Sequence, residues 1–133
     1  NKTVLSGVPS SLPALIKAYR IQDKARGVGF DWESPEDVWT KVEEELGELR
    51  EAISSGSPEE VEGEFGDFLF SVINAARKYK VNPDNALEAT NRKFIRRFTY
   101  VEQRSKELGF SSLKEMTLGQ MDELWDEAKA HGL

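Results

Sequence analysis

The sequence predicts an all-α protein, an antiparallel bundle of helices. Apolar residues recur at intervals of three and four along most of the chain, which is the period of an α-helix. A capping residue followed by proline, the pattern that starts a helix, occurs at Ser34-Pro35, Ser57-Pro58 and Asn82-Pro83. No stretch shows the alternating pattern of a strand.

Length and composition limit the function. The chain has 133 residues, enough for one core, so we expect a single domain over 1–133 with an irregular lead-in at 1–9. The formal net charge of -6 argues against direct nucleic-acid binding. With no cysteine and one histidine, His131, the chain cannot form disulfides, cysteine-based zinc sites or multi-histidine metal sites.

Targeting signals are not visible in the sequence. No apolar run approaches the roughly 20 residues of a membrane span, and the N-terminal residues do not resemble a signal peptide. We therefore expect a cytoplasmic location. Because the chain begins at Asn1 rather than Met, we expect it to be cut from a longer protein.

The first helix is expected to begin after Ser10 or Ser11, either of which can cap it, and to end near Arg26, before two glycines. Its apolar positions are Leu12, Leu15, Ile16 and Tyr19. The loop that follows carries Phe30 and Trp32, which we expect to pack on the bundle.

The second helix is expected from Pro35 to Ser54, capped by Ser34. Its apolar stripe consists of Val38, Val42, Leu46, Leu49 and Ile53. At about 100° per residue, Glu45 lies at the margin of this stripe, Glu48 lies further round, and Lys41 lies between them. We therefore expect Glu45 to be close to the core.

The third helix is expected from Pro58 to Tyr79. Its main apolar stripe consists of Val61, Phe65, Phe68, Leu69, Val72 and Ala76. Phe70 and Ile73 extend the apolar surface nearly all round, so we expect this helix to be buried against a second copy in a homodimer. Asn74 is a polar residue in this apolar half and must find a partner.

The fourth helix is expected from Pro83 to Leu108, where Gly109 ends it, and a terminal helix from Leu118 to Ala130. The apolar stripe of the fourth helix consists of Leu87, Phe94, Phe98, Val101 and Leu108. Its basic residues share a margin, at Lys93, Arg97 and Arg104. A basic surface on this helix would suit a polyphosphate.

Two carboxylate pairs, each spaced three residues apart, lie on successive predicted helices: Glu45 with Glu48, and Glu64 with Asp67. Antiparallel packing of these helices would bring the four carboxylates together, where their charges repel. The simplest compensation is Mg²⁺, a hard cation that prefers oxygen ligands. The structural alternative is that the acids are paired with the basic residues of the fourth helix.

The sequence contains neither a Walker loop nor a glycine-rich dinucleotide fingerprint, so phosphates must be held through metal and side chains. We interpret Trp32, Trp39 and Trp125 mainly as residues of the core or its edge. Of these three, Trp125 is the best candidate for a ligand contact, because it lies on a separate terminal helix.

The segments Glu45-Leu46-Gly47-Glu48 and Glu64-Phe65-Gly66-Asp67, fifteen residues apart, resemble the ExxE…ExxD signature of the MazG-type all-α nucleoside triphosphate pyrophosphohydrolases. Gly29-Phe30-Asp31-Trp32 before them and residues 91–98 after them strengthen the likeness, which runs from about Leu12 to Ala130. It is greatest to the C-terminal domain of bacterial MazG. Bacterial MazG carries two such domains in tandem, whereas this chain shows one.

This resemblance implies a helical bundle, a tight homodimer and Mg²⁺-dependent release of pyrophosphate from NTPs. Position by position, it implies that the metal ligands are Glu45, Glu48, Glu64 and Asp67. It implies that the substrate contacts are Lys41, Lys93, Arg97 and Trp125.

The reaction expected from these residues is NTP + H₂O → NMP + PPi, by attack of water at the α-phosphorus. Mg²⁺ is the expected cofactor, with Mn²⁺ as a substitute. The general base is either Glu48 or the outer Glu44. Two alternatives stay open: a pyrophosphatase for a narrower substrate such as dUTP, dCTP or phosphoribosyl-ATP, and a non-catalytic helical dimerisation module.

Overall fold

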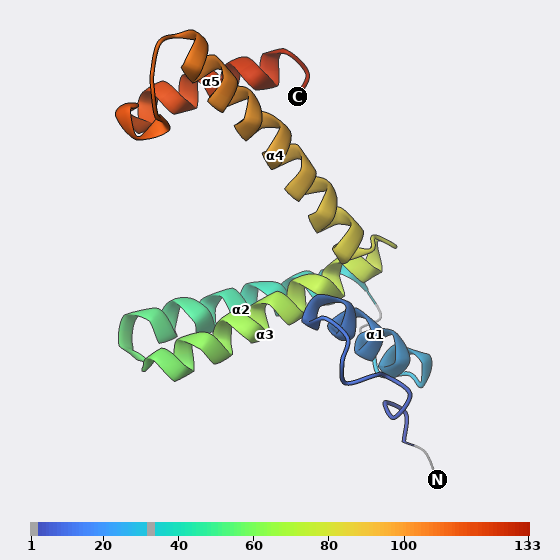
Figure 1. The fold of residues 1–133 in the computed structure, drawn as a ribbon. Coiled ribbons are helices and arrows are strands. Elements are labelled where there is room, and N and C mark those ends of the chain that lie inside the picture. The colour runs from blue at the N-terminus through green and yellow to red at the C-terminus, as the bar shows by residue number, and fades with distance from the viewer. Residues whose placement is uncertain (1–2, 32–33) are drawn as a thin grey trace. The chain divides into compact units, whose positions relative to one another are not determined.

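A computed structural model describes residues 3–31 and 34–133. Within them the chain is helical and contains no strand, which confirms the all-α prediction (Figure 1). The elements are α1 (Ala14–Gly27), α2 (Pro35–Ser55), α3 (Pro58–Lys78), α4 (Pro83–Glu107), the 3₁₀ turn η1 (Leu113–Glu115) and α5 (Leu118–Ala130). None of the described helices combines the length and apolar character that a membrane span requires. Trp32 lies outside the described residues, so its packing stays a prediction.

Serine side chains cap α2 and α3 as predicted. The Ser34 hydroxyl accepts a hydrogen bond from the backbone N–H of Asp37 at 3.3 Å, and that of Ser57 accepts one from Glu60 at 3.2 Å. The predicted start of the first helix is wrong, because α1 begins only at Ala14, after Pro13. A proline disfavours the helical conformation in the residue before it, so the helix cannot begin at Leu12.

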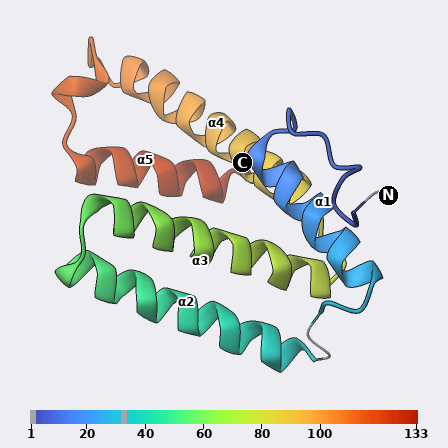
Figure 2. The same cartoon turned by 90° about the horizontal axis from the view of Figure 1, so that it is seen from below.

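The chain divides into two compact units, Asn1–Asp84 and Asn85–Leu133, while a single domain over the whole chain stays a prediction. In the first unit, α2 and α3 form an antiparallel hairpin and α1 packs on α3 (Figures 1 and 2). The core of this hairpin consists of Val38, Val42 and Ala75, with Phe68 packed against them. Antiparallel packing brings the middle of α2 beside the first half of α3.

The chain buries only part of the apolar stripe predicted on α3, where Phe68 packs on the core. Phe65 and Leu69 are 47% and 57% exposed, whereas the buried residues of α3 are Ser71, Ile73, Asn74 and Ala75. The loop aromatic Phe30 is also exposed, at 76%, so the prediction that it packs on the bundle is wrong. Helical periodicity tells which residues share a face but not which face meets the rest of the chain. The described chain therefore leaves a continuous apolar strip of α3 uncovered.

The second unit has its own small core. Val101 of α4 packs with Met116 and Leu124, and further aromatic and aliphatic side chains surround them. Of the apolar stripe predicted on α4, Val101 alone is buried, and the others are exposed. Gly109 has a φ of 95°, which an L side chain rarely adopts, and it ends the helix as predicted.

Glu127 of α5 is tied to α4 by two donors. The Tyr100 hydroxyl and the Arg104 Nε both donate to its Oε1, the latter at 2.7 Å. The hydrogen bond from Tyr100, followed by that from Arg104, lowers the pKa of the Glu127 carboxyl below 4.5. Because the folded chain favours the ionised form, this group contributes stability above pH 4.5, and the contribution is lost as pH falls through the folded-state pKa.

Glu127→Gln should therefore lower the free energy of unfolding at neutral pH, and the deficit against the parent should shrink as pH falls below 4.5. Urea unfolding at a series of pH values measures it. Glu123→Gln, at an exposed acid of the same helix, is the matched control and should show no such pH-dependent deficit. A deficit of constant size at every pH would contradict the assignment.

Candidate metal centre and adjoining cavity

Three acidic side chains converge between α2 and α3. One carboxylate oxygen each from Glu45, Glu48 and Glu64 lies within 4.8 Å of the other two. The first two share a face of α2 because they are three residues apart, and the antiparallel hairpin places Glu64 of α3 opposite them. Oxygen ligands at this spacing, without histidine or cysteine, suit a hard divalent cation.

Glu45 is buried deeply for a carboxylate. The residue is 6% exposed, as its position at the margin of the apolar stripe predicted. Its Oε1 accepts an ion-paired hydrogen bond from Lys41 Nζ at 2.9 Å. Its Oε2 is buried and has no hydrogen-bond partner among the described residues, and the same is true of Glu64 Oε2. Burying carboxylate oxygens without a partner is unfavourable, and a cation beside these two atoms would offset that cost.

The charge of Glu64 is disfavoured where it lies. Burial raises the pKa of this carboxyl above 4.5, and the negative charges of Glu48, Asp67 and Glu45 raise it further. In the same cluster the hydrogen bond to Glu45 raises the pKa of Lys41, so this lysine stays charged. Lys41 thus compensates part of the negative charge of the cluster. The cluster keeps an excess of negative charge, which a divalent cation would neutralise.

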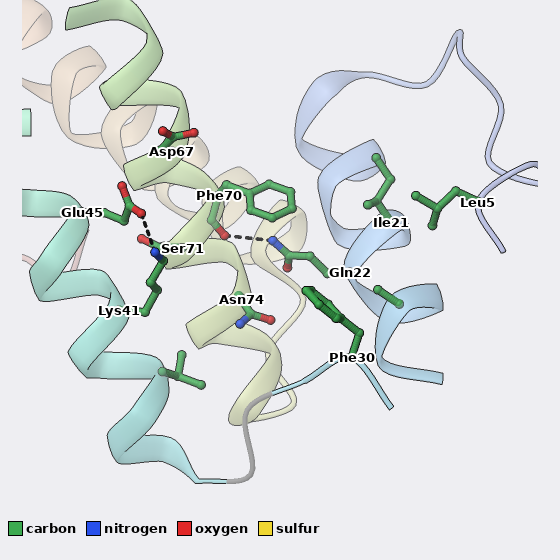
Figure 3. Close-up of a pocket in the computed structure, with 12 residues that line it drawn as sticks. Leu5, Ile21, Gln22, Phe30, Lys41, Glu45, Asp67, Phe70, Ser71 and Asn74 are labelled. Atoms are coloured by element: carbon green, nitrogen blue, oxygen red, sulfur yellow. Dashed lines mark hydrogen bonds and ion pairs between the residues drawn. The ribbon is translucent and has the colours of Figure 1, made fainter. Parts of the chain in front are cut away.

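A cavity of about 400 Å³ adjoins the cluster (Figure 3). Its walls come from the lead-in, α1, the loop after α1, α2 and α3, and both Glu45 and Asp67 line it. Asp67 is exposed and lies outside the group of three oxygens, one turn beyond Glu64 on α3. The carboxylate cluster and the cavity therefore share part of their lining.

The residues that the sequence predicted as substrate contacts fall in both units. Lys41 lies in the first unit, at the cavity, and also approaches the exposed Glu44, at 3.8 Å. In the second unit, the guanidinium of Arg97 lies 5.6 Å from the ring centroid of Trp125, and its Nε donates to the carbonyl of Leu133 at 2.8 Å. Lys93 is exposed on α4, one turn before Arg97. Trp39 is a surface residue that donates to the Tyr79 hydroxyl at 2.6 Å.

Known proteins resemble this chain along most of its length. The model of the MazG nucleotide pyrophosphohydrolase domain matches residues 33–101, more than half of the chain. The chain belongs to the MazG family. It is 47% identical over 118 residues to the nucleoside triphosphate pyrophosphohydrolase/pyrophosphatase MazG of Thermotoga maritima, a match that covers 89% of this chain and 45% of that protein.

Two further relatives match nearly the whole chain. The nucleoside triphosphate pyrophosphohydrolase of Escherichia coli K12 is 37% identical over 131 residues, which cover 96% of this chain and 49% of that protein. YabN of Bacillus subtilis is 49% identical over 129 residues, which cover 96% of this chain and 26% of that protein. The chain thus spans at most half the length of these relatives.

The site of this MazG-family chain contains one residue that sequence reasoning missed. Gln22 of α1 is 6% exposed and lines the cavity. It lies three residues after Tyr19, in line with the apolar positions of the first helix. A polar residue among the apolar positions of this helix was the only sign in the sequence that Gln22 has a role beyond packing. Ser71 and Asn74, also buried polar residues, come from the face of α3 that the chain covers.

If the carboxylate cluster binds a cation, Mg²⁺ should stabilise the folded chain. Binding to the folded state alone adds about 2.7 kcal/mol of stability at a hundredfold excess over Kd. Glu64→Gln should leave the chain as stable as the parent in EDTA, or more stable, because it removes one repelling charge. It should also abolish most of the stabilisation by Mg²⁺. Thermal melts in EDTA and in excess Mg²⁺ measure both effects.

Glu62→Gln is the matched control, because Glu62 is an exposed acid of the same helix outside the cluster. It should keep the full Mg²⁺ response. A parent that does not respond to Mg²⁺, together with a Glu64→Gln variant that is destabilised in EDTA, would contradict a metal centre and favour pairing of the acids with cations of the chain.

Proposed function

We propose that this chain is a Mg²⁺-dependent nucleoside triphosphate pyrophosphohydrolase, with Mn²⁺ as a substitute ion, that converts NTP and water to NMP and pyrophosphate. The observation that carries the proposal is a pair of buried carboxylate oxygens, on Glu45 and Glu64, that have no hydrogen-bond partner among the described residues. They lie beside a cavity large enough for part of a nucleotide. The names of the T. maritima and E. coli relatives agree with this reaction.

In this proposal, Glu45, Glu48 and Glu64 hold the cation, and Asp67 completes the set from the next turn of α3. The donor chemistry fits, because all four are carboxylates and three of them already lie together. When bound, the cation polarises the phosphoryl oxygens and lowers the pKa of a water molecule. The burial of Glu45 fixes the position of its carboxylate, and Lys41 holds one of its oxygens.

We assign the proton acceptor to Glu44 or Glu48. Glu44 is exposed and lies outside the group of three oxygens, so its carboxylate is not committed to the cation. Glu48 is exposed and belongs to that group. Either group takes a proton from the attacking water as the new bond to the α-phosphorus forms and the bond to the bridging oxygen breaks.

Charge on the leaving pyrophosphate requires cations from the chain. We assign this role to Lys93 and Arg97, which lie one turn apart on α4. We assign Lys41, at the cavity of the first unit, and Trp125, whose ring the Arg97 guanidinium approaches within the second unit, as further substrate contacts. The narrower form of the same proposal is a pyrophosphatase that accepts one substrate, such as dUTP, dCTP or phosphoribosyl-ATP.

Product analysis in H₂¹⁸O tests the reaction. Attack at the α-phosphorus should place the label in NMP and leave pyrophosphate unlabelled, with no orthophosphate formed at first. Glu45→Gln should lower kcat by about a hundredfold or more, as expected when a ligand that positions the cation is lost, and Glu62→Gln should not. NDP and orthophosphate as first products would refute the assignment, and inactivity on every NTP with Mg²⁺ or Mn²⁺ would favour a non-catalytic module.

We further propose that the chain acts as a homodimer through the uncovered strip of α3. Phe65, Leu69 and Val72 recur at intervals of four and three, and all are exposed in the single chain. An apolar strip of this kind is costly to leave in water and fits a twofold interface, where the same surface serves both copies.

Sedimentation tests the dimer. The parent should sediment as a dimer at micromolar concentration, and Leu69→Glu should sediment as a monomer, because the interface would bury an unpaired charge. Val28→Glu, at a valine that is 66% exposed after α1, should stay dimeric. A monomeric parent would contradict the proposal.

A further inference from the structure

The buried amide of Gln22 is half satisfied. Its Nε2 donates to the backbone carbonyl of Phe70 at 2.9 Å, which ties α1 to α3. Its Oε1 is buried and has no hydrogen-bond partner in the described part of the chain. Leaving a buried acceptor unsatisfied costs free energy, so this oxygen is a site where a ligand can contribute.

The chemistry of the anchor fixes which end of the amide faces Phe70. A backbone carbonyl can only accept, so the nitrogen must face Phe70 and the oxygen must face away from it. Figure 3 shows the amide nitrogen directed at the Phe70 carbonyl and the oxygen turned the other way, toward the space beside Phe30. Gln22 therefore presents its Oε1 as a hydrogen-bond acceptor whose orientation is set by the bond to Phe70.

The cavity around this acceptor is suited to a flat heterocycle. Its walls are apolar and aromatic, and they are formed by Leu5, Ile21, Phe30, Val38 and Phe70. The cavity volume of about 400 Å³ is within the range of small-ligand sites. At the same cavity, Glu45 and Asp67 belong to the proposed metal centre. A ligand with phosphates at the carboxylates can thus place an aromatic ring against these walls.

A second amide in the lining is also anchored. Asn74 accepts a hydrogen bond from Arg77 through Oδ1, at 2.9 Å. Its amide oxygen is therefore engaged by Arg77. Of the two amides in the lining, Gln22 is the one whose buried oxygen has no hydrogen-bond partner among residues 3–31 and 34–133.

We propose that Gln22 is a specificity-determining residue, and that its Oε1 accepts a hydrogen bond from an N–H on the edge of the substrate's heterocyclic base. This inference rests on the proposed function, because it takes the base to belong to a nucleoside triphosphate. A base that lacks an N–H at that edge leaves Oε1 buried and unpaired, and such a site rejects the analogue for that reason.

Two matched pairs of nucleotides test the inference. ATP and CTP each carry an exocyclic amino group, while the triphosphates of purine riboside and of 2-pyrimidinone riboside lack that group and have no N–H on the base. The two pairs are ATP with purine riboside triphosphate, and CTP with 2-pyrimidinone riboside triphosphate. In whichever pair the parent chain binds more tightly, kcat/KM should be about tenfold or more higher for the nucleotide with the amino group. Gln22→Leu should reduce this ratio to about one.

The ratio of kcat/KM between the two members of a pair separates base recognition by Gln22 from a purely structural role of this residue. If Gln22 merely tied α1 to α3, Gln22→Leu would lower kcat/KM for both members of a pair equally and leave the ratio unchanged, which would overturn the inference. Gln103→Leu, at an exposed glutamine of α4, is the matched control and should keep the ratio of the parent. If Gln22→Leu does not fold, the ratio of the parent alone decides, and a ratio of one overturns the inference.

Uncleavable α,β-methylene forms of the same four nucleotides, titrated by calorimetry with Mg²⁺, separate this inference from the proposed reaction. A tenfold preference in Kd without any hydrolysis would support the role of Gln22 and refute the reaction. Hydrolysis without a preference in either pair would support the reaction and refute the role of Gln22. Failure of all four analogues, and of α,β-methylene dUTP, to bind would refute both.

Discussion

Electrostatic repulsion among three carboxylates is the constraint on which this site depends. The hairpin of α2 and α3 sets Glu45, Glu48 and Glu64 against one another, with one of the three almost fully buried. Lys41 compensates a single oxygen of Glu45. The cost of this arrangement is visible in the raised pKa of Glu64, which burial and its acidic neighbours produce together. A divalent cation bound among the three carboxylates would offset their repulsion. A cluster of this kind fits a chain that belongs to the MazG family.

The hairpin also explains why a metal centre and a cavity adjoin. Its polar side runs along α3 through Glu64, Asp67, Ser71 and Asn74, at intervals of three and four. The first two are charged and are the proposed ligands of the cation, whereas the last two are uncharged. Asp67, Ser71 and Asn74 all line the cavity. α1 closes this cavity with Gln22, whose amide is oriented by the backbone of α3. One face of α3 thus contributes side chains to both parts of the site.

Much of this arrangement could be predicted from the sequence. The serine-proline pairs at Ser34 and Ser57 predicted where α2 and α3 begin. The position of Glu45 at the margin of the apolar stripe of α2 predicted that it is buried. The covered face of α3 could not be fully predicted, because Phe65, Leu69 and Val72 are apolar and yet lie exposed in the single chain. Gln22 was missed for a related reason: its partner is a backbone carbonyl 48 residues away, which no local pattern reveals.

Anomalous diffraction from crystals grown with Mn²⁺ tests the central claim most directly. The account predicts a manganese peak between α2 and α3, within coordination distance of the Glu45 and Glu64 oxygens that lack a partner in the described chain. It also predicts that Lys41 remains on the other oxygen of Glu45. A crystal in which the three carboxylates lie together as described, with Mn²⁺ present in excess and no anomalous peak among them, would contradict it.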